Sequence, residues 1–239
     1  HLEELRRRIL KSLIAIAIGL AVCIAYAPGL ILFLKRPAAA VGLRLMAIEG
    51  TEMFSIYFRV AFAGGVCLAA PFVLWQVWRF IEPGLHSHEK RYAAPFLIST
   101  TVCFAGGAVF GYAMVSPYLL KLQIAMAQAA DIDLRMSASS YLGLLTNTVV
   151  AMGAIFEMPP VIFILSRIGL VSAKFLVRNF KYAFLLFSVA SAILTPSADI
   201  APMLAFMAVM TGVYAVSILV ALVFGRTRQR GTGHFTEEN

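Results

Sequence analysis

The sequence predicts an all-α, polytopic membrane protein with six transmembrane helices, and two observations support this prediction. First, the composition is that of a chain that faces lipid: of 239 residues, 61% are hydrophobic and only 13% are charged, and the mean hydropathy is +0.86. A water-soluble domain usually carries about 25% charged residues, so this chain could not cover its surface with polar groups. Second, the apolar residues gather in six runs, most of them near the length of roughly 20 residues that a membrane-spanning helix needs.

The six runs form one transmembrane domain over residues 1–226, and charged residues mark their ends. The fourth run is interrupted only by Glu157, and Asp199 alone divides the fifth from the sixth. The fifth is the weakest, because Pro196 leaves about 15 residues of helix, roughly 22 Å, against a hydrocarbon core of about 30 Å. We therefore expect the bilayer to be thinner around it. The approximate spans are residues 12–34, 60–78, 93–116, 140–166, 182–196 and 200–224.

The distribution of Lys and Arg predicts the orientation of the spans. One set of loops and ends is rich in basic residues: Arg6, Arg7, Arg8, Lys11, Arg79, Lys90, Arg91, Arg167, Lys174, Arg178, Lys181, Arg226, Arg228 and Arg230. The alternate loops hold fewer: Lys35, Arg36, Arg44, Arg59, Lys121 and Arg135. Because basic residues accumulate on the cytoplasmic side, we expect both termini in the cytoplasm. The polar tail at residues 227–239 is expected to be disordered there.

Several function classes are excluded by what the chain lacks. The net charge of +8 comes from basic residues placed between apolar runs rather than along one face, so we expect no nucleic-acid partner. The three cysteines follow no zinc or disulfide spacing, and His86 and His88 alone make a poor metal site, so no metal or cofactor is expected. GxSxG, HExxH, Walker and GxGxxG motifs are absent. We therefore expect that the protein is not an enzyme.

Glu157 is the carboxylate that the pattern places deep in the membrane. It precedes Arg167, at the end of its span, by about 15 Å of helix. An ionised carboxylate at that depth costs about 2.5–3.5 kcal/mol on insertion scales, so the neutral form is favoured. Pro159 and Pro160 crowd the carbonyls four residues before them, which predicts a kink and free carbonyls beside Glu157. These groups need a polar cavity or a partner; a purely structural hydrogen bond to a neighbouring helix is the alternative.

Other acidic residues flank the spans, and each has a structural and a functional interpretation. Glu4 belongs to an amphipathic N-terminal segment, expected to form a short interfacial helix, where it or Glu3 can pair with Arg7 or Arg8. Glu89 can stabilise the start of the third span through the helix dipole, or remain available to a cationic ligand. Thr51 can cap a helix in the first outer loop, with Glu52 in the first turn, and Asp199 can cap the last helix.

Taken together, these segments resemble the TatC family, the multispanning subunit of twin-arginine protein translocases. The resemblance covers nearly the whole chain, and its motifs follow one another in the family's order. They are HLxELRxR at residues 1–8, ExF at 52–54, the P…QxWxFixPgLxxxE signature at 71–89, FExP at 156–159 and TP…D at 195–199. One departure is that the last helix reads Tyr214-Ala215, where the family often has Tyr-Glu.

The resemblance implies a concave, glove-like bundle with an outer cap in the plasma (inner) membrane of a prokaryote. It implies a receptor for signal peptides with paired arginines, within a translocase that exports folded cargo and is driven by the proton-motive force. Carried over by position, Glu4, Phe80 and Glu89 would form the signal-peptide site, and Glu157 would face the concavity. Glu52 and Phe54 would lie in the outer loop, and Asp199 in the outer hairpin. The implied partners are these peptides, small single-span subunits and membrane lipid, within a larger complex that holds several copies of the chain.

The residues are compatible with this role and leave one alternative open. Guanidinium groups favour carboxylate acceptors in bidentate geometry, but an exposed pair contributes only about 0–1 kcal/mol. Selectivity would therefore need both Glu4 and Glu89, over an apolar floor that Phe80 and Trp78 could supply. The alternative is an ion-coupled transporter or proton channel that uses Glu157, since carboxylates inside membranes often relay protons.

Overall fold

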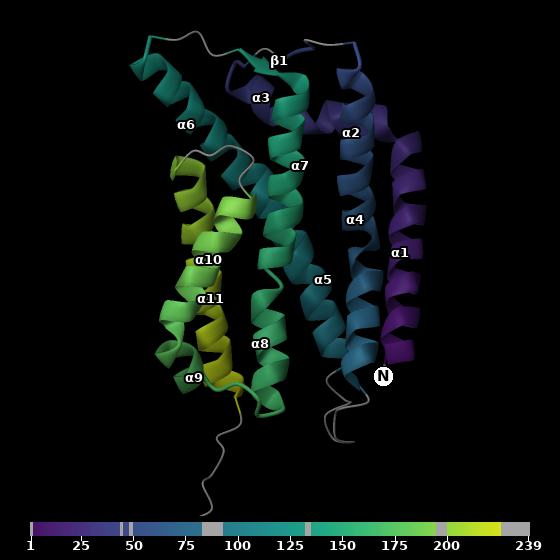
Figure 1. Ribbon diagram of the computed structural model, residues 1–239, viewed down its shortest axis with the longest axis vertical. Helices are drawn as coiled ribbons and strands as arrows, with labels where there is room; N and C mark the ends of the chain where they lie inside the picture. The colour runs from purple at the N-terminus through teal and green to yellow at the C-terminus, as the bar shows by residue number, and fades with distance from the viewer. Residues whose placement is uncertain are drawn as a thin grey trace, which may run out of the picture.

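The computed structural model describes residues 2–43, 45–47, 50–82, 93–131, 135–194 and 200–225. Long helices run side by side along the longest axis of the molecule (Figure 1). The elements are α1 (Leu2–Ala25), α2 (Ala27–Leu34), α3 (Arg36–Ala40), β1 (Leu45–Met46), α4 (Glu52–Ile81), α5 (Ala93–Phe110), the π-helical turn η3 (Gly111–Val115), α6 (Ser116–Ala129), β2 (Met136–Ser137), α7 (Ala138–Ile155), α8 (Met158–Arg167), α9 (Ala173–Arg178), α10 (Phe180–Leu194) and α11 (Ile200–Phe224).

Five helical stretches of the described chain are long and apolar enough to cross a membrane. They are Glu3–Ala25, Glu52–Phe80, Pro95–Ala129, Ala138–Arg167 and Pro202–Phe224. The apolar helix α10 is shorter, with 15 residues or about 22 Å of length, as expected for the fifth span. The prediction of an all-α, polytopic membrane protein is thereby confirmed, with one two-residue parallel pairing between β1 and β2 as the exception.

Many of the basic residues gather at one end of the bundle, which we call the basic end. Figure 1 places the start of α1, the end of α4, the end of α8 and α9 at the bottom of the view, and these elements carry Arg6–Arg8, Arg79, Arg167 and Arg178. The turn at α2, α3 and β1 lies at the opposite end, which we call the cap end. These residues belong to the loops and ends that the positive-inside pattern assigns to one side of the membrane, so their grouping at one end is as the sequence predicts.

The N-terminal region differs from its prediction in two respects. The amphipathic segment is not a separate interfacial helix, because α1 runs without a break from Leu2 to Ala25. The charge-free run at residues 12–34 is not one helix either: it breaks at Tyr26, and α2 turns across the cap end (Figure 1). Pro28, in the first turn of α2, explains the break, because it lacks an N–H and crowds the preceding turn.

Two buried or partly buried tyrosines fasten the cap end to the bundle. The Tyr141 hydroxyl, from α7, donates a 2.8 Å hydrogen bond to the Leu34 carbonyl, and the Tyr112 hydroxyl donates a 2.9 Å bond to the Phe33 carbonyl. Both acceptors belong to the last turn of α2, whose carbonyls lack partners within the helix.

The expected cap on α4 is partly realised: the helix starts after Thr51, but the Thr51 side chain makes no capping hydrogen bond.

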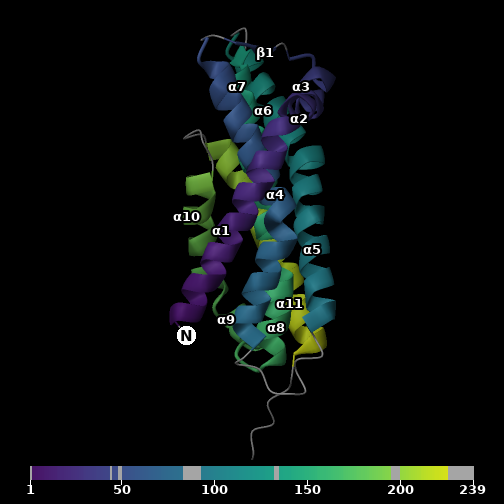
Figure 2. The same cartoon turned by 90° about the vertical axis from the view of Figure 1, so that its right-hand side faces the viewer.

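Helix α1 crosses α4 obliquely and lies along it (Figure 2). The two backbones approach most closely at Gly19 and Gly65, where a Cβ added to Gly19 would lie 2.6 Å from the Gly65 carbonyl oxygen. From this crossing the two helices continue to the basic end, and a groove lies between them there. A second, largely apolar cavity of about 760 Å³ lies between α5, α8 and α11.

Candidate functional site

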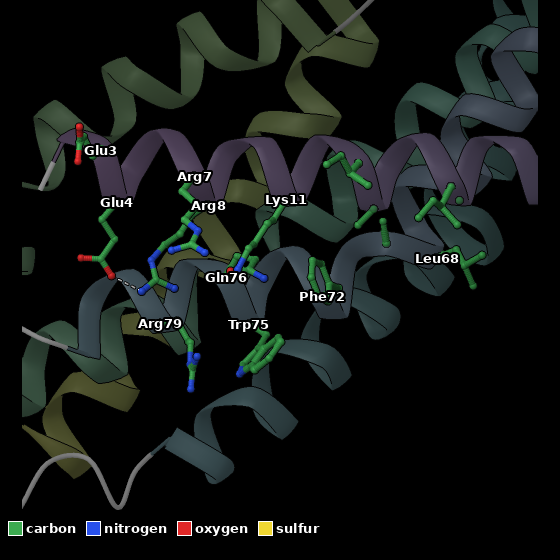
Figure 3. Close-up of a pocket in the computed structure, with 15 residues that line it drawn as sticks. Glu3, Glu4, Arg7, Arg8, Lys11, Leu68, Phe72, Trp75, Gln76 and Arg79 are labelled. Carbon is green, nitrogen blue, oxygen red and sulfur yellow. Dashed lines mark hydrogen bonds and ion pairs between the residues drawn. The ribbon is translucent and has the colours of Figure 1, made fainter.

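The groove at the basic end has a volume of about 1080 Å³ and is built from one face of α1 and one face of α4 (Figure 3). Its lining residues recur every three or four positions, which is the spacing of a single helix face. From α1 they are Glu3, Glu4, Arg7, Arg8, Lys11, Ile14, Ala15, Ile18 and Gly19, and from α4 Leu68, Ala69, Phe72, Trp75, Gln76 and Arg79. Charged side chains therefore occupy the mouth, and apolar ones the part that runs into the membrane.

Glu4 lies at the mouth of this groove and is paired within its own helix. The Arg8 Nη2 donates a hydrogen bond to Glu4 Oε1, and the two side chains form an i, i+4 ion pair (Figure 3). The Glu4 side chain is 39% exposed and that of Arg8 17% exposed. Of the pairings that the sequence allowed between Glu3 or Glu4 and Arg7 or Arg8, the structure forms this one. Glu4 thus already holds a guanidinium group in a half-exposed position.

Phe80 is exposed at the last turn of α4, at the same end of the bundle as Glu4, but it is not among the residues that line the groove. The sequence suggested that its neighbour Trp78 helps to form an apolar floor for the ligand. In the structure Trp78 is buried and cannot do so. Trp78 is 2% exposed and packs against Phe96, with ring centroids 4.9 Å apart, and against Ile164. The exposed tryptophan at this end is Trp75, which lines the groove.

Two of the acidic residues singled out in the sequence, Glu89 and Asp199, lie outside the described residues, as do His86 and His88. Glu52 starts α4 at the cap end, and Phe54 is 81% exposed in its first turn. The structure therefore separates Glu52 and Phe54 from Glu4 by the length of α4. Among the described residues, no group of three or more His, Cys, Asp and Glu side chains could hold a metal ion.

Glu157 lies at the break between α7 and α8, where the two prolines predicted a kink. Helix α7 ends at Ile155 and α8 begins at Met158, with Pro159 and Pro160 in its first turn. Within the described part of the chain, neither carboxylate oxygen of Glu157 has a hydrogen-bond partner, and both oxygens are buried. The flanking residues Phe156 and Pro159 line the apolar cavity between α5, α8 and α11, whereas Glu157 is not among its lining residues.

The groove contains polar residues to which the sequence assigned no binding role: Arg7, Lys11, Gln76 and Arg79. Gln76 belongs to the motif at residues 71–89 and is only 6% exposed. The available signal was the spacing of residues 68, 72, 75, 76 and 79 along one helix face. That signal shows which residues share a face, but the sequence does not show that this face meets α1.

Comparison with known proteins places this architecture in a family. The family model described as Sec-independent protein translocase protein (TatC) matches residues 1–209. The Sec-independent protein translocase protein TatC of Koribacter versatilis is 40% identical over 237 residues, covering 96% of this chain and 87% of the relative. The corresponding protein of Deinococcus radiodurans is 32% identical over 230 residues, covering 94% of this chain and 85% of the relative.

Two solved structures share the fold. One is described as the twin arginine translocase receptor TatC, is 32% identical and superimposes with a TM-score of 0.86, covering 95% of this chain and all of the other. The same receptor in the detergent DDM gives a TM-score of 0.84 and covers 92% of this chain and 99% of the other. These matches confirm the predicted fold class and the resemblance to the TatC family.

Proposed function

This chain belongs to the TatC family, and we propose that it is the signal-peptide receptor and core scaffold subunit of a twin-arginine protein translocase. In this proposal it lies in the plasma (inner) membrane of a prokaryote, and the basic end with both termini faces the cytoplasm. The translocase exports folded proteins and is driven by the proton-motive force. Two solved structures that carry the description of a twin-arginine translocase receptor support the receptor role.

The observation that carries the proposal is the ion pair between Glu4 and Arg8. Because Glu4 accepts a guanidinium from its own helix, its carboxylate has the position and exposure to accept one from a ligand. The internal pair is half-exposed, so solvent screens it and it is weak. An arginine of a signal peptide can thus replace Arg8 at little cost, and we regard Arg8 as an internal substitute for the ligand.

A receptor for paired arginines needs a second acceptor and an apolar contact. Glu89 is the proposed second acceptor, and it follows α4 in the sequence beyond the described residues. Phe80, 37% exposed in the last turn of α4, is the proposed apolar contact for the peptide. Two charge-assisted hydrogen-bonded pairs with planar guanidinium groups would distinguish arginine from lysine, which cannot form the bidentate pair.

The further parts of the proposal concern the assembly. Small single-span subunits and additional copies of this chain are the proposed partners within the translocase, and Glu52, Phe54 and Asp199 are the proposed outer-side contacts. Glu157 is the proposed intramembrane polar residue. Its buried oxygens, without partners in the described part of the chain, also support the second candidate function, an ion-coupled transporter or proton channel.

Site-specific crosslinking tests the receptor role. A photoreactive residue is placed at Glu4, Phe80 or Glu89 of the full-length protein in membranes, and a twin-arginine signal peptide is compared with its twin-lysine counterpart. We expect labelling of the twin-arginine peptide at all three positions and weaker labelling of the other peptide. A probe at Phe54, which is exposed at the opposite, cap end of the bundle, is the control and should label neither. Equal labelling of both peptides at all positions would overturn the proposed recognition.

A further inference from the structure

We propose that the groove between α1 and α4 binds one anionic phospholipid, taken from the leaflet that meets the basic end of the bundle. Its volume, about 1080 Å³, is at the upper limit of the roughly 300–1,000 Å³ typical of pockets for small molecules. The groove opens beside helices that are long and apolar enough to span the membrane, so the molecules that surround it are lipids. The inference does not depend on the receptor role.

The inner part of the groove is suited to an acyl chain. Ile14, Ile18 and Leu68 line it and are 59%, 61% and 59% exposed, and Phe72 adds a partly exposed ring. The floor is made by small residues, including Gly19 at the close approach of the two helices. An apolar channel of this kind favours a hydrocarbon chain and offers no partner for a polar group.

The mouth of the groove carries an excess of positive charge. Arg8 is neutralised by Glu4, which leaves Arg7, Lys11 and Arg79 against Glu3 among the charged lining residues. All three basic side chains are exposed: Arg7 and Lys11 come from α1, and Arg79 comes from α4, where its side chain points away from α1 in Figure 3. Each basic residue near an anionic membrane surface contributes attraction to the lipid headgroups. A phosphate at the mouth would be attracted electrostatically by all three.

The junction between the charged mouth and the apolar part has the polarity of a phospholipid's interfacial region. Gln76, only 6% exposed, lines the groove there, and its amide can donate to a phosphate or ester oxygen (Figure 3). Trp75 lies at the same level, with the Arg79 guanidinium carbon 5.4 Å from its ring centroid. Tryptophan favours the membrane interface because its ring is apolar and its N–H is polar.

An anionic headgroup fits the groove better than a zwitterionic one. A zwitterionic headgroup brings a cation to a mouth where three basic side chains already face only one acidic residue, Glu3, whereas phosphatidylglycerol brings only negative charge. A transmembrane segment of another protein could also cover the apolar part, but it would need acidic residues at the mouth. The charge complementarity therefore favours the anionic lipid.

The chain contains two tryptophans that make the groove directly observable. Trp75 is 38% exposed and lines the groove, whereas Trp78 is 2% exposed in the interior and supplies an unquenched baseline. The full-length protein is reconstituted into phosphatidylethanolamine vesicles that contain either phosphatidylglycerol or phosphatidylethanolamine with brominated acyl chains, at the same mole fraction. Bromine quenches tryptophan only at short range. We expect stronger quenching by the brominated phosphatidylglycerol.

A charge-matched pair of variants tests whether this preference belongs to the groove. R7Q/K11Q/R79Q removes three positive charges from the mouth, and K174Q/R178Q/K181Q removes three from exposed positions on α9 and at the start of α10 at the same end of the bundle. The first variant should lower the preference for phosphatidylglycerol by roughly tenfold, since each basic residue contributes to headgroup attraction. The second should retain the preference.

The outcome is decisive in either direction. Loss of the preference in the groove variant alone supports the site. Equal quenching by both brominated lipids in the unmodified protein would overturn it and leave the groove to a protein segment. Equal loss in both variants would also overturn it, because the attraction would then be to the basic end as a whole. If R7Q/K11Q/R79Q does not fold, the variant R7K/R79K takes its place. It keeps the positive charge of the mouth, so it must keep the preference for phosphatidylglycerol, and loss of that preference would overturn the proposal.

Discussion

Gly19 and Gly65 face each other across the crossing of α1 and α4, and neither position has room for a side chain. A Cβ at Gly65 would lie 2.6 Å from the Leu20 amide nitrogen, and a Cβ at Gly19 would lie 2.6 Å from the Gly65 carbonyl oxygen. Both obstacles are backbone atoms, which cannot move aside as a flexible side chain can. The pair therefore sets the distance between the two helices that form the groove.

Replacing Gly65 by Ala should destabilise the protein. The added methyl group forces α1 away from α4, and overpacking of this kind costs about 1–3 kcal/mol. The measurement is the thermal unfolding midpoint of the purified protein in detergent. Gly106→Ala in α5 is the control, because a Cβ there meets nothing within 4 Å. An unchanged midpoint for Gly65→Ala would contradict the close approach of the two helices.

Removing the Arg8 guanidinium should strengthen signal-peptide binding, and removing the Glu4 carboxylate should weaken it. In Arg8→Gln the carboxylate is no longer paired, so the peptide does not have to displace a competitor, and we expect an increase of up to about fivefold in affinity. Glu4→Gln should show the opposite change. Titration of a fluorescent twin-arginine peptide measures both. Lys174→Gln removes a charge from α9 and should have little effect; weaker binding in Arg8→Gln would contradict the competition.

Loss of the Tyr141 hydroxyl should loosen the cap end. In Tyr141→Phe the Leu34 carbonyl loses its 2.8 Å hydrogen bond while the buried ring keeps its packing, so we expect a loss of about 1–2 kcal/mol in unfolding free energy. Tyr182→Phe changes an exposed tyrosine of α10 and serves as the control. Limited proteolysis should show faster cleavage near α2 in Tyr141→Phe than in Tyr182→Phe. Equal rates would show that this bond does not hold the cap.

Glu157→Gln distinguishes the proposed receptor from the alternative transporter. The amide has almost the shape of the carboxyl and cannot ionise, so we expect the variant to be at least as stable as the unmodified protein, because no charge can be buried. As a receptor, the purified chain alone in liposomes should show no proton flux that depends on Glu157. Flux measured with a trapped pH dye that disappears in Glu157→Gln would instead support the transporter.

The sequence predicted the elements whose cause is local. Long apolar runs predicted the spanning helices, and Pro159 with Pro160 predicted the break at Glu157, since a missing N–H acts within one turn. The turn at Tyr26 was missed because the run at residues 12–34 contains no charge to mark a helix end, although Pro28 was a visible signal. The two tryptophans could not be distinguished from the sequence, because they are the same residue type. Trp78 is buried against Phe96, whereas Trp75 lines the groove.

By itself, the sequence determined that the chain spans a membrane, which end of the bundle is basic, and to which family it belongs. Hydrophobicity and charge act on each segment separately, so these properties can be derived from segments one at a time. Only the tertiary structure decided that Glu4 pairs with Arg8 and that the α1 face carrying Arg7 and Lys11 meets the α4 face carrying Arg79. In lipid, helix faces meet through close packing at small residues rather than through hydrophobicity, and that packing depends on the shapes of both partners.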